Sequence, residues 1–513
     1  MIRALTASAA LLAGLLAAAP AATADPAGRD AAAGESGSAH HALPRLHATT
    51  GSDAAIVDAR GARVLLRGVN VNGVGRYFQA NPDLQPTVPL TRDDFHDIAQ
   101  LGFNSVRLIV SWSGLEPTRG AYDTAYVEEI RRAVGWAASY GLYVVLDMHQ
   151  DAYGIAVDTP LDVTCPAGSS PNNGWDGAPA WATITDGAST CRPGERELAP
   201  AVRHAWQNFY DDTDGVQGEL VRTWGRLARD FATDTTVAGY DLLNEPGIGL
   251  DAENNDTADL GAFYGRAIDA IRQGERRGGG FSHMVFFEPS VWWSNQGQSS
   301  VPYGFTGDTN LVFAPHIYAE SLSGNTIEDG FVRARTVAGT YGGVPVWSGE
   351  WGFFPDQPAD ATDKIDRYAA TEDAFGYGGA WWDWKQACGD PHVVNQPGGQ
   401  PAAVSPSLVR YTCPDQVAQP VDPAFGDVLG RPVARAVPGR VTTLTSDGRT
   451  GSFSLAGRHE PGAQRCALRV WVPARFAAER VRVRGIDHLH RTHRLGNVVL
   501  RGCVADRFRL RIG

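Results

Sequence analysis

The chain has 513 residues, of which 43% are hydrophobic and 20% are charged, and its formal net charge is −12. This composition is ordinary for a large soluble protein, and the length gives room for one large domain and a smaller one. After residue 24 no run of about 18 apolar residues occurs, which excludes a membrane-spanning helix from the mature protein.

Residues 1–24 have the three parts of a secretory signal peptide. Arg3 supplies a positive charge, residues 5–19 form an apolar run, and small residues at 22–24 offer a cleavage site. We therefore expect a secreted protein. The following residues, 25–46, are rich in Ala, Gly, Ser and His and are predicted to be a disordered lead-in.

Residues 47–430 alternate short apolar runs with helical patterns. The candidate strands end near Val71, Val110, Met148, Leu243, Glu288, His316, Glu350 and Trp384. Helical spacing of apolar residues is clearest over 91–100, 124–140, 216–231, 258–277, 326–341 and 361–375. Eight strands that alternate with helices predict an α/β fold, a (β/α)8 TIM barrel, over residues 47–430.

One connection of this barrel is long. Roughly 90 residues separate the third and fourth candidate strands, and residues 151–214 among them are rich in Pro, Gly, Asn, Asp and Trp. We expect this insertion to form a wall or lid over an active site. A second loop-rich segment, 386–427, follows the eighth strand.

The segment 431–513 has a different pattern, with short alternating runs separated by turn residues. The expected strands are 451–455, 467–472, 480–483, 497–500 and 507–511, which predict a small C-terminal β-sandwich. The segment contains 17 Arg, no Lys and five acidic residues, so its net charge is 17 − 5 = +12, and −12 − 12 = −24 remains for residues 1–430.

This basic charge has two interpretations. It could form ion pairs with the acidic barrel, or it could make a peripheral contact with an anionic membrane or micelle surface. The segment has no recognised nucleic-acid-binding motif, so we expect no nucleic acid as partner.

Six cysteines fit an oxidising compartment. We predict disulfides between neighbours in the sequence, Cys165–Cys191, Cys388–Cys413 and Cys466–Cys503. Metal binding is disfavoured because no two cysteines have the C-x-x-C spacing and no histidine stands at ligand spacing.

Two glutamates stand at the ends of candidate strands: Glu245 precedes Pro246, and Glu350 precedes Trp351. Carboxylates at these strand ends are where TIM-barrel enzymes carry their chemistry, and two of them suffice to cleave a glycosidic bond. A general acid at Glu245 requires a raised pKa, which burial would supply. Glu288 is a third carboxylate in a similar place, and we interpret it as a positioning or structural residue.

Polar residues at other strand ends complete the set. Arg107 lies inside an apolar strand, either in a structural ion pair or holding the nucleophile ionised. His149 and Asp151 could bind sugar hydroxyls, and the Asn244 amide could donate to a sugar 2-hydroxyl.

Aromatic and imidazole side chains end three further runs. His316 and Tyr318 are two residues apart in an extended segment, so both could reach the carboxylates, with Tyr318 donating to the nucleophile. Trp382 belongs to a tryptophan-rich run whose aromatic face could stack against a sugar ring.

Together these positions resemble glycoside hydrolase family 5, a retaining (β/α)8 family. The matching residues, in chain order, are Arg107, His149, Asn244, Glu245, His316, Tyr318, Glu350 and Trp382. The resemblance implies that Glu350 attacks the anomeric carbon and that Glu245 is the acid/base, with carboxyl groups ~5–5.5 Å apart. It implies no cofactor and no metal.

A narrower resemblance covers nearly all of the mature chain. The Asp147-Met148-His149-Gln150-Asp151 stretch, Asn244-Glu245-Pro246 and the C-terminal segments 431–439 and 451–455 are similar to the secreted endoglycoceramidases. This implies release of an intact oligosaccharide from ceramide in glycosphingolipids, with His149 and Asp151 as sugar ligands. Some relatives have a lysine after the first strand, whereas residues 70–76 contain only Arg76 as a base, which leaves the preferred glycan open.

An amphiphilic substrate also needs an apolar slot. Candidate lining residues are Trp175, Ile184, Val291, Trp292, Trp293, Phe353 and Phe354. Two other functions remain open: a cellulase- or mannanase-like enzyme acting on soluble polysaccharide, and a non-catalytic glycolipid-binding protein. We expect a monomer.

Overall fold

The computed structural model describes residues 42–298, 300–353, 361–394 and 396–513. Residues 42–513 form one compact unit. The predicted signal peptide, most of the lead-in and Phe354 lie outside the described residues. Within the described ranges no helix is long and apolar enough to span a bilayer.

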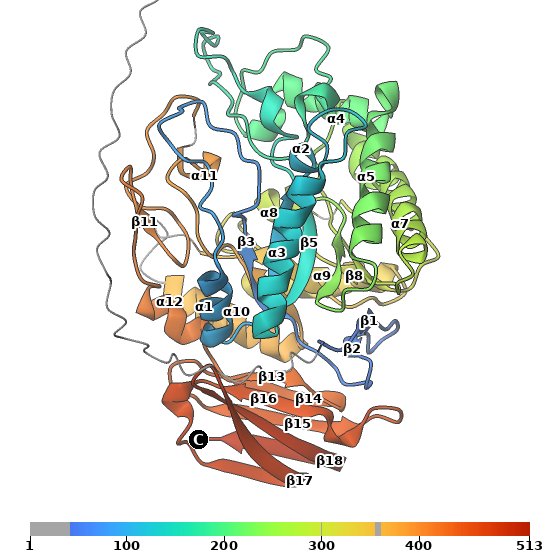
Figure 1. Ribbon diagram of the computed structural model, residues 1–513, viewed down its shortest axis with the longest axis vertical. Helices are drawn as coiled ribbons and strands as arrows, with labels where there is room; N and C mark the ends of the chain where they lie inside the picture. Colours follow the sequence, from blue (N-terminus) through green and yellow to red (C-terminus); the bar gives the residue numbers. More distant parts are fainter. Residues whose placement is uncertain (1–41, 299, 354–360, 395) are drawn as a thin grey trace, which may run out of the picture. The chain divides into compact units, whose positions relative to one another are not determined.

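Eight parallel strands form the barrel (Figure 1). They are β3 (Arg67–Val71), β4 (Ser105–Ser111), β5 (Tyr143–His149), β6 (Val237–Asp241), β7 (Met284–Phe287), β8 (Leu311–Phe313), β9 (Trp347–Trp351) and β10 (Gly378–Trp381). Neighbours pair in chain order, β10 pairs with both β9 and β3, and a bridge from Phe313 to Val346 joins β8 to the residue before β9. The predicted TIM barrel is confirmed.

Each barrel strand is buried on both faces, as parallel strands require. In β4, Val106 and Leu108 pack in the cluster that includes the helices, whereas Ile109 packs with Tyr318 and Trp382. Arg107 alternates with these apolar residues and is fully buried inside the barrel. The strand pattern therefore forces a cation into the barrel interior, where it must find anionic partners.

The main helices agree with the predicted ones to within two residues at each end. They are α1 (Arg92–Leu101), α3 (Thr124–Tyr140), α5 (Val216–Asp230), α7 (Leu260–Arg277), α9 (Ile327–Thr340) and α10 (Ala361–Phe375). Shorter helices are α2 (Trp112–Leu115), α4 (Pro200–Tyr210), α6 (Ala252–Asn254), α8 (Trp292–Gln296), α11 (Pro391–Val394) and α12 (Pro423–Leu429). At α1, Thr91 and Asp94 form the reciprocal side-chain-to-backbone bonds of a capping box, which fixes the start of the helix.

The long insertion lies where the barrel strands end, and Figure 1 shows it in teal and green around α4. It contains short 3-10 turns, among them Ile155–Val157, Ala180–Ala182 and Arg196–Leu198, and the Cys165–Cys191 disulfide. The loop-rich segment after β10 contains α11, β11 (Tyr411–Thr412), β12 (Val417–Ala418) and the Cys388–Cys413 disulfide.

The C-terminal domain is an antiparallel β-structure, as predicted. Its strands are β13 (Val433–Ala436), β14 (Gly439–Ser446), β15 (Phe453–His459), β16 (Leu468–Val472), β17 (Val481–Arg494) and β18 (Asn497–Ile512). The long strand β18 pairs first with β16 and then with β15 on one edge, and with β17 on the other. The third predicted disulfide, Cys466–Cys503, is also present. At the other end of the described chain, β1 (Leu46–Ala48) and β2 (Ile56–Asp58) form a small hairpin sheet, so regular structure begins at Leu46.

The C-terminal domain packs against the end of the barrel where the strands begin. Arg435 donates to the carbonyls of Gly102 and Phe103, which precede β4, at 3.1 and 3.2 Å. Arg431 is buried and pairs with Glu372 of α10 at 2.5 Å. Part of the excess positive charge is therefore used in contacts with the barrel, as one of the two interpretations requires.

We predict that Arg431→Met lowers the free energy of unfolding by about 3 kcal/mol, because it removes one of the two cations, Arg67 and Arg431, that neutralise the buried carboxylates of Glu372 and Asp373. The matched control is Arg449→Met, whose partner Asp366 lies at the surface. The control should cost less than about 1 kcal/mol. Urea unfolding of both variants checks this, and equal losses would contradict the assignment of Arg431 as a buried anchor.

Candidate active site

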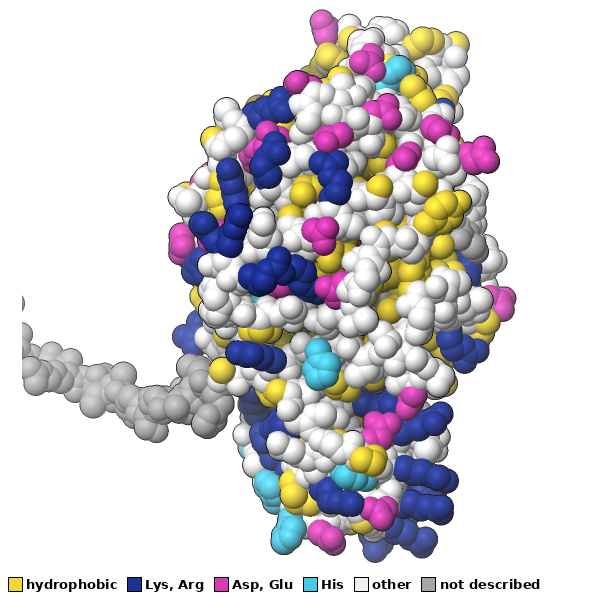
Figure 2. All heavy atoms as spheres, turned by 90° about the vertical axis from the view of Figure 1, so that its right-hand side faces the viewer, with side chains coloured by type: hydrophobic (Ala, Val, Ile, Leu, Met, Phe, Trp, Pro, Cys, Tyr) yellow, Lys and Arg dark blue, Asp and Glu magenta, His cyan; other side chains and the backbone are white. Residues whose placement is uncertain are grey.

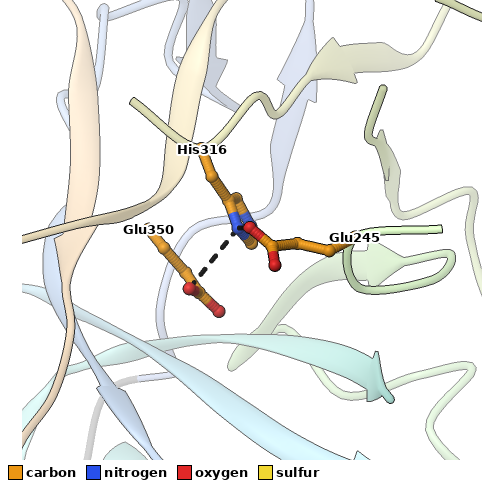
Figure 3. Close-up of side chains that lie close together, drawn as sticks. All are labelled: Glu245, His316 and Glu350. Carbon is orange, nitrogen blue, oxygen red and sulfur yellow. Dashed lines mark hydrogen bonds and ion pairs between the residues drawn. The ribbon is translucent and has the colours of Figure 1, made fainter. Parts of the chain in front are cut away.

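The strand ends bring the two candidate carboxylates together. Glu245 follows β6 and Glu350 lies in β9, and the His316 imidazole lies between them (Figure 3). One oxygen of Glu245, one of Glu350 and a ring nitrogen of His316 all lie within 4.8 Å of one another. Both glutamates are buried, with 9% and 5% of their surface exposed.

Arg107 is the centre of a buried charge cluster. Its guanidinium contacts Glu350 at 2.8 Å, Glu288 at 2.8 Å, Asp241 at 2.9 Å and Asp147 at 2.9 Å. Burial alone would lower the pKa of Arg107, but the four carboxylates raise it well above its ordinary value. Arg107 is thus a permanent cation that fixes the position of each of these acids.

Glu350 receives donors on both oxygens. Arg107 donates to Oε1 at 2.8 Å, and the Tyr318 hydroxyl donates to Oε2 at 2.9 Å, as the sequence suggested. Burial raises the pKa of Glu350, while the positive charges of His316 and Arg107 oppose that rise. The two donors also set the direction of the carboxylate, which leaves its orientation little freedom.

Glu245 lies in a strained segment and is hydrogen-bonded to a cation. Its φ of 35° is in the left-handed region, which is uncommon for a residue with a side chain. His316 Nδ1 lies 2.9 Å from Oε1, and the Ser294 hydroxyl donates to the same oxygen. Figure 3 shows the imidazole of His316, which follows β8 in the chain, pointing toward both carboxylates.

The expectation of a raised pKa at Glu245 is wrong for this structure. Burial does raise the pKa, but the hydrogen bond and charge of His316 and the Ser294 hydroxyl outweigh it and lower the value. The pKa of His316 is raised well above its ordinary value because Glu288 and Glu350 overcome the effect of burial. The proton is therefore held on His316, one hydrogen bond away from Glu245.

Glu288 uses both oxygens within the protein. Oε1 lies 2.8 Å from Arg107 and 3.1 Å from His316, and Oε2 accepts the backbone N–H of Glu245 at 2.9 Å. These contacts support its interpretation as a positioning residue. Together with Asp147 and Asp241 it also forms a set of potential metal ligands, but the Arg107 guanidinium already pairs with all three.

His149, Asp151 and Trp382 lie side by side next to this cluster. The His149 ring stacks on Trp382 with centroids 5.6 Å apart, and its Nδ1 lies 2.7 Å from Asp147. Asp151 accepts from Arg196 of the insertion at 2.6 Å. Burial would raise the pKa of Asp151, but Arg196 and the neighbouring histidines lower it, so Asp151 is ionised.

The wall around Trp382 contains buried polar atoms that have no hydrogen-bond partner among the described residues. They are the Tyr77 hydroxyl and the Trp175 indole nitrogen. The His392 ring links them, with centroids 6.0 Å from Tyr77, 5.0 Å from Trp175 and 5.4 Å from Trp382. Buried polar groups are ordinarily hydrogen-bonded, so this wall is suited to a ligand rich in hydroxyls.

Several of these residues were missed by sequence reasoning. Asp147 and Asp241 could have been identified from the sequence, because each is an acid in an apolar strand. Ser294, Arg196 and His392 gave no signal, since each lies in a helix or 3-10 turn that is too short to show periodicity. They reach the site only through tertiary structure.

The proposed apolar lining is only partly supported. Trp293 packs in the main core against Phe313, with ring centroids 5.6 Å apart, so it is not a lining residue. Val291 does border a cleft shared with Glu245 and Arg196. Trp175 belongs to the polar wall, where Arg196 lies 4.1 Å from its ring.

Comparisons with known proteins agree with this geometry. The family model described as Cellulase (glycosyl hydrolase family 5) matches residues 57–388. A crystal structure of an endogalactoceramidase is 43% identical, with a TM-score of 0.83 over 92% of this chain and 100% of that one. The lactosyl-enzyme intermediate of endo-glycoceramidase II from Rhodococcus sp. is 27% identical, with a TM-score of 0.70 over 89% and 98%.

Among curated proteins, the endoglycoceramidase of Hydra vulgaris is 28% identical over 293 residues, which are 51% of this chain and 53% of the relative. The chain thus spans about half the length of the curated relatives it matches first.

One acid of the insertion has a pKa in an accessible range. Asp176 is buried and accepts from the Ser111 hydroxyl at 2.7 Å and from the Gly177 N–H at 2.7 Å. Burial raises the pKa of Asp176 to about 6, against the opposing effects of His149 and of these hydrogen bonds. Ionisation of Asp176 is therefore less favourable in the folded protein than in the unfolded chain.

We predict a pH-dependent stability difference between the wild type and Asp176→Asn. Below pH ~4 the acid is protonated in both states; as the pH rises to about 6 only the unfolded chain ionises, which lowers wild-type stability. The difference between a pKa of about 6 and the ordinary value of ~4 corresponds to about 3 kcal/mol. The free energy of unfolding of Asp176→Asn should therefore increase by about 3 kcal/mol relative to that of the wild type between low and neutral pH. Urea unfolding checks this, with exposed Asp162→Asn as control. A pH-independent difference would contradict the prediction.

Proposed function

Because the chain belongs to glycosyl hydrolase family 5, we propose that it is a secreted, retaining endo-β-glycosidase that cleaves between oligosaccharide and ceramide in glycosphingolipids. The observation that carries the proposal is the pair of buried carboxylates, Glu245 and Glu350, with oxygens within 4.8 Å. An inverting enzyme would need ~6.5–9.5 Å between them to place a water.

The substrate class rests on the relatives. The endogalactoceramidase structure is similar along its whole length, and endo-glycoceramidase II from Rhodococcus sp. has been solved as a complex with ganglioside GM3. Three disulfides support the proposed secretion, because such bonds persist in oxidising compartments.

In the first step an oxygen of Glu350 attacks the anomeric carbon and forms a glycosyl ester. Arg107 and Tyr318 hold the carboxylate ready for this attack and stabilise its charge. The bond from the anomeric carbon to the ceramide oxygen breaks, and that oxygen must receive a proton.

Glu245 supplies this proton from its hydrogen bond with His316. The imidazolium and the carboxylate are 2.9 Å apart, so one proton shared between them can reach Glu245 as the leaving oxygen gains charge. In the second step Glu245 takes a proton from water, the water oxygen attacks the anomeric carbon, and Glu350 is released as a carboxylate.

The sugar is held beside these carboxylates. His149, Asp151 and the Trp382 ring form one side of the sugar-binding site. The wall atoms that have no partner among the described residues are free to bind sugar hydroxyls. One N–H of Asn244 donates to the Gln150 carbonyl at 2.9 Å, which leaves the other for the 2-hydroxyl. We also propose that the enzyme makes a peripheral contact with a membrane or micelle surface through its basic C-terminal domain.

The substrate class is tested with fluorescent lactosylceramide and galactosyl-linked glycolipids against carboxymethyl-cellulose and mannan. The expected products are intact oligosaccharide and ceramide, with no reaction of the soluble polysaccharides. Cleavage of cellulose or mannan alone would assign the protein to the polysaccharide-degrading members of the family. Binding of glycolipid without turnover would assign it to the non-catalytic binders.

The residue roles predict different losses. Glu350→Gln should lower kcat for lactosylceramide by at least about four orders of magnitude, because the nucleophile is removed. Glu245→Gln should lower kcat for lactosylceramide by about 10²–10⁴-fold. It should form the glycosyl-enzyme at the wild-type rate from dinitrophenyl lactoside, because that leaving group needs no proton. Exposed Glu128→Gln is the control. Equal losses of Glu245→Gln on both substrates would refute its role as acid.

A further inference from the structure

Two sets stand out among the 17 arginines of the C-terminal domain. Arg431, Arg435, Arg440, Arg449 and Arg475 each contact an acidic side chain or a carbonyl of a residue before 431. The second set, the arginine array, is exposed and consists of Arg458, Arg482, Arg484, Arg507, Arg509 and Arg511. Figure 2 shows rows of Lys and Arg side chains over this part of the molecule, at the lower right.

The arginine array follows from strand alternation. In β18 the exposed Arg507, Arg509 and Arg511 alternate with Phe508 and Leu510, which are buried in the domain core. The flanking strands β15 and β17 contribute the other three arginines to the same surface. Positions two apart in a strand are ~7 Å apart and neighbouring strands are ~5 Å apart, so the charges form a two-dimensional array.

Like charges stand directly opposite one another in this array. The register pairs Arg482 with Arg511 and Arg484 with Arg509 across β17 and β18, and the third pair is Arg458 with Arg507 across β15 and β18. Directly opposed like charges destabilise a sheet. Within the described ranges none of the six makes an ion pair or side-chain hydrogen bond, so the repulsion is not relieved inside the chain.

We propose that the arginine array binds the anionic phosphate and carboxylate headgroups of a phospholipid membrane. Arginine binds phosphate through two parallel N–H bonds, and the domain has no lysine. A spread of charge in two directions matches a plane of headgroups better than a linear polymer, which needs one row or groove. The residues flanking the array include no large exposed apolar side chain, so the contact is electrostatic and without insertion into the bilayer.

The location of the arginine array fits this role. The C-terminal domain packs where the barrel strands begin, whereas Glu245 and Glu350 lie where the strands end. A membrane bound at the array therefore lies at the end of the barrel opposite the catalytic opening, so the array tethers the enzyme to a lipid surface and does not itself present the substrate to the site. This inference rests on the proposed function in one respect: a glycolipid substrate explains why the enzyme would contact a lipid surface.

The test is sedimentation with vesicles that contain no glycolipid, so that its outcome does not depend on catalysis. Wild type should pellet with phosphatidylcholine vesicles that contain about 30% phosphatidylserine, should not pellet with pure phosphatidylcholine, and should be released by high salt. The variant R482Q/R484Q/R509Q/R511Q should bind several hundred-fold more weakly, at about fivefold for each arginine.

The control R132Q/R229Q/R276Q/R277Q removes four exposed barrel arginines and the same total charge, and it should bind like wild type. Both variants should hydrolyse dinitrophenyl lactoside at the wild-type rate. If the wild type itself does not hydrolyse this substrate, the proposed catalytic function is wrong, but the membrane proposal is unaffected. The membrane assignment would be overturned if the wild type bound neutral and anionic vesicles equally, or if the array variant bound anionic vesicles as tightly as the wild type. Binding of the wild type to heparin but not to vesicles would also overturn it.

Discussion

The site depends on one buried cation, Arg107, which the alternation of β4 places inside the barrel among carboxylates from other strands. Through Glu350 it orients the proposed nucleophile. Through Asp147 it reaches His149 at the sugar wall, and through Glu288 it reaches the backbone of Glu245. A charge buried this deeply is stable only while its partners stay in place, so catalytic geometry and barrel packing are a single electrostatic arrangement.

A second cation, His316, gives the two glutamates different roles, with Glu245 as acid/base and Glu350 as nucleophile. It holds the proton beside Glu245, where a general acid must deliver it, and its positive charge together with Arg107 favours ionisation of Glu350. When Glu350 becomes an ester and loses its charge, one cause of the raised pKa of His316 disappears. The pair of Glu245 and His316 then holds its proton less tightly, which suits the base that the second step requires.

Much of this was predictable from sequence, because apolar strands that end in polar residues can be recognised without tertiary information. The barrel, its main helices and the strand-end residues follow from such patterns, and the three disulfides were predicted from the proximity of neighbouring cysteines in the sequence. The proton position was not predictable, since it results from three acids around His316. Arg196 and His392 come from helical turns that are too short to show periodicity. The arginine-rich strands were predicted as short pieces, because residues 487–494 of β17 show no apolar alternation, and the opposition of like charges emerges only from the register.

The most direct test of the account is to trap the glycosyl-enzyme with a 2-deoxy-2-fluoro lactoside that has a good leaving group, and to locate the sugar by peptide mass spectrometry. The account predicts one sugar, bound as an ester to Glu350, and accumulation of the same adduct in Glu245→Gln. A label on Glu288 or Glu245, or turnover with no covalent adduct, would contradict the assignment of Glu350 as the nucleophile of a retaining enzyme.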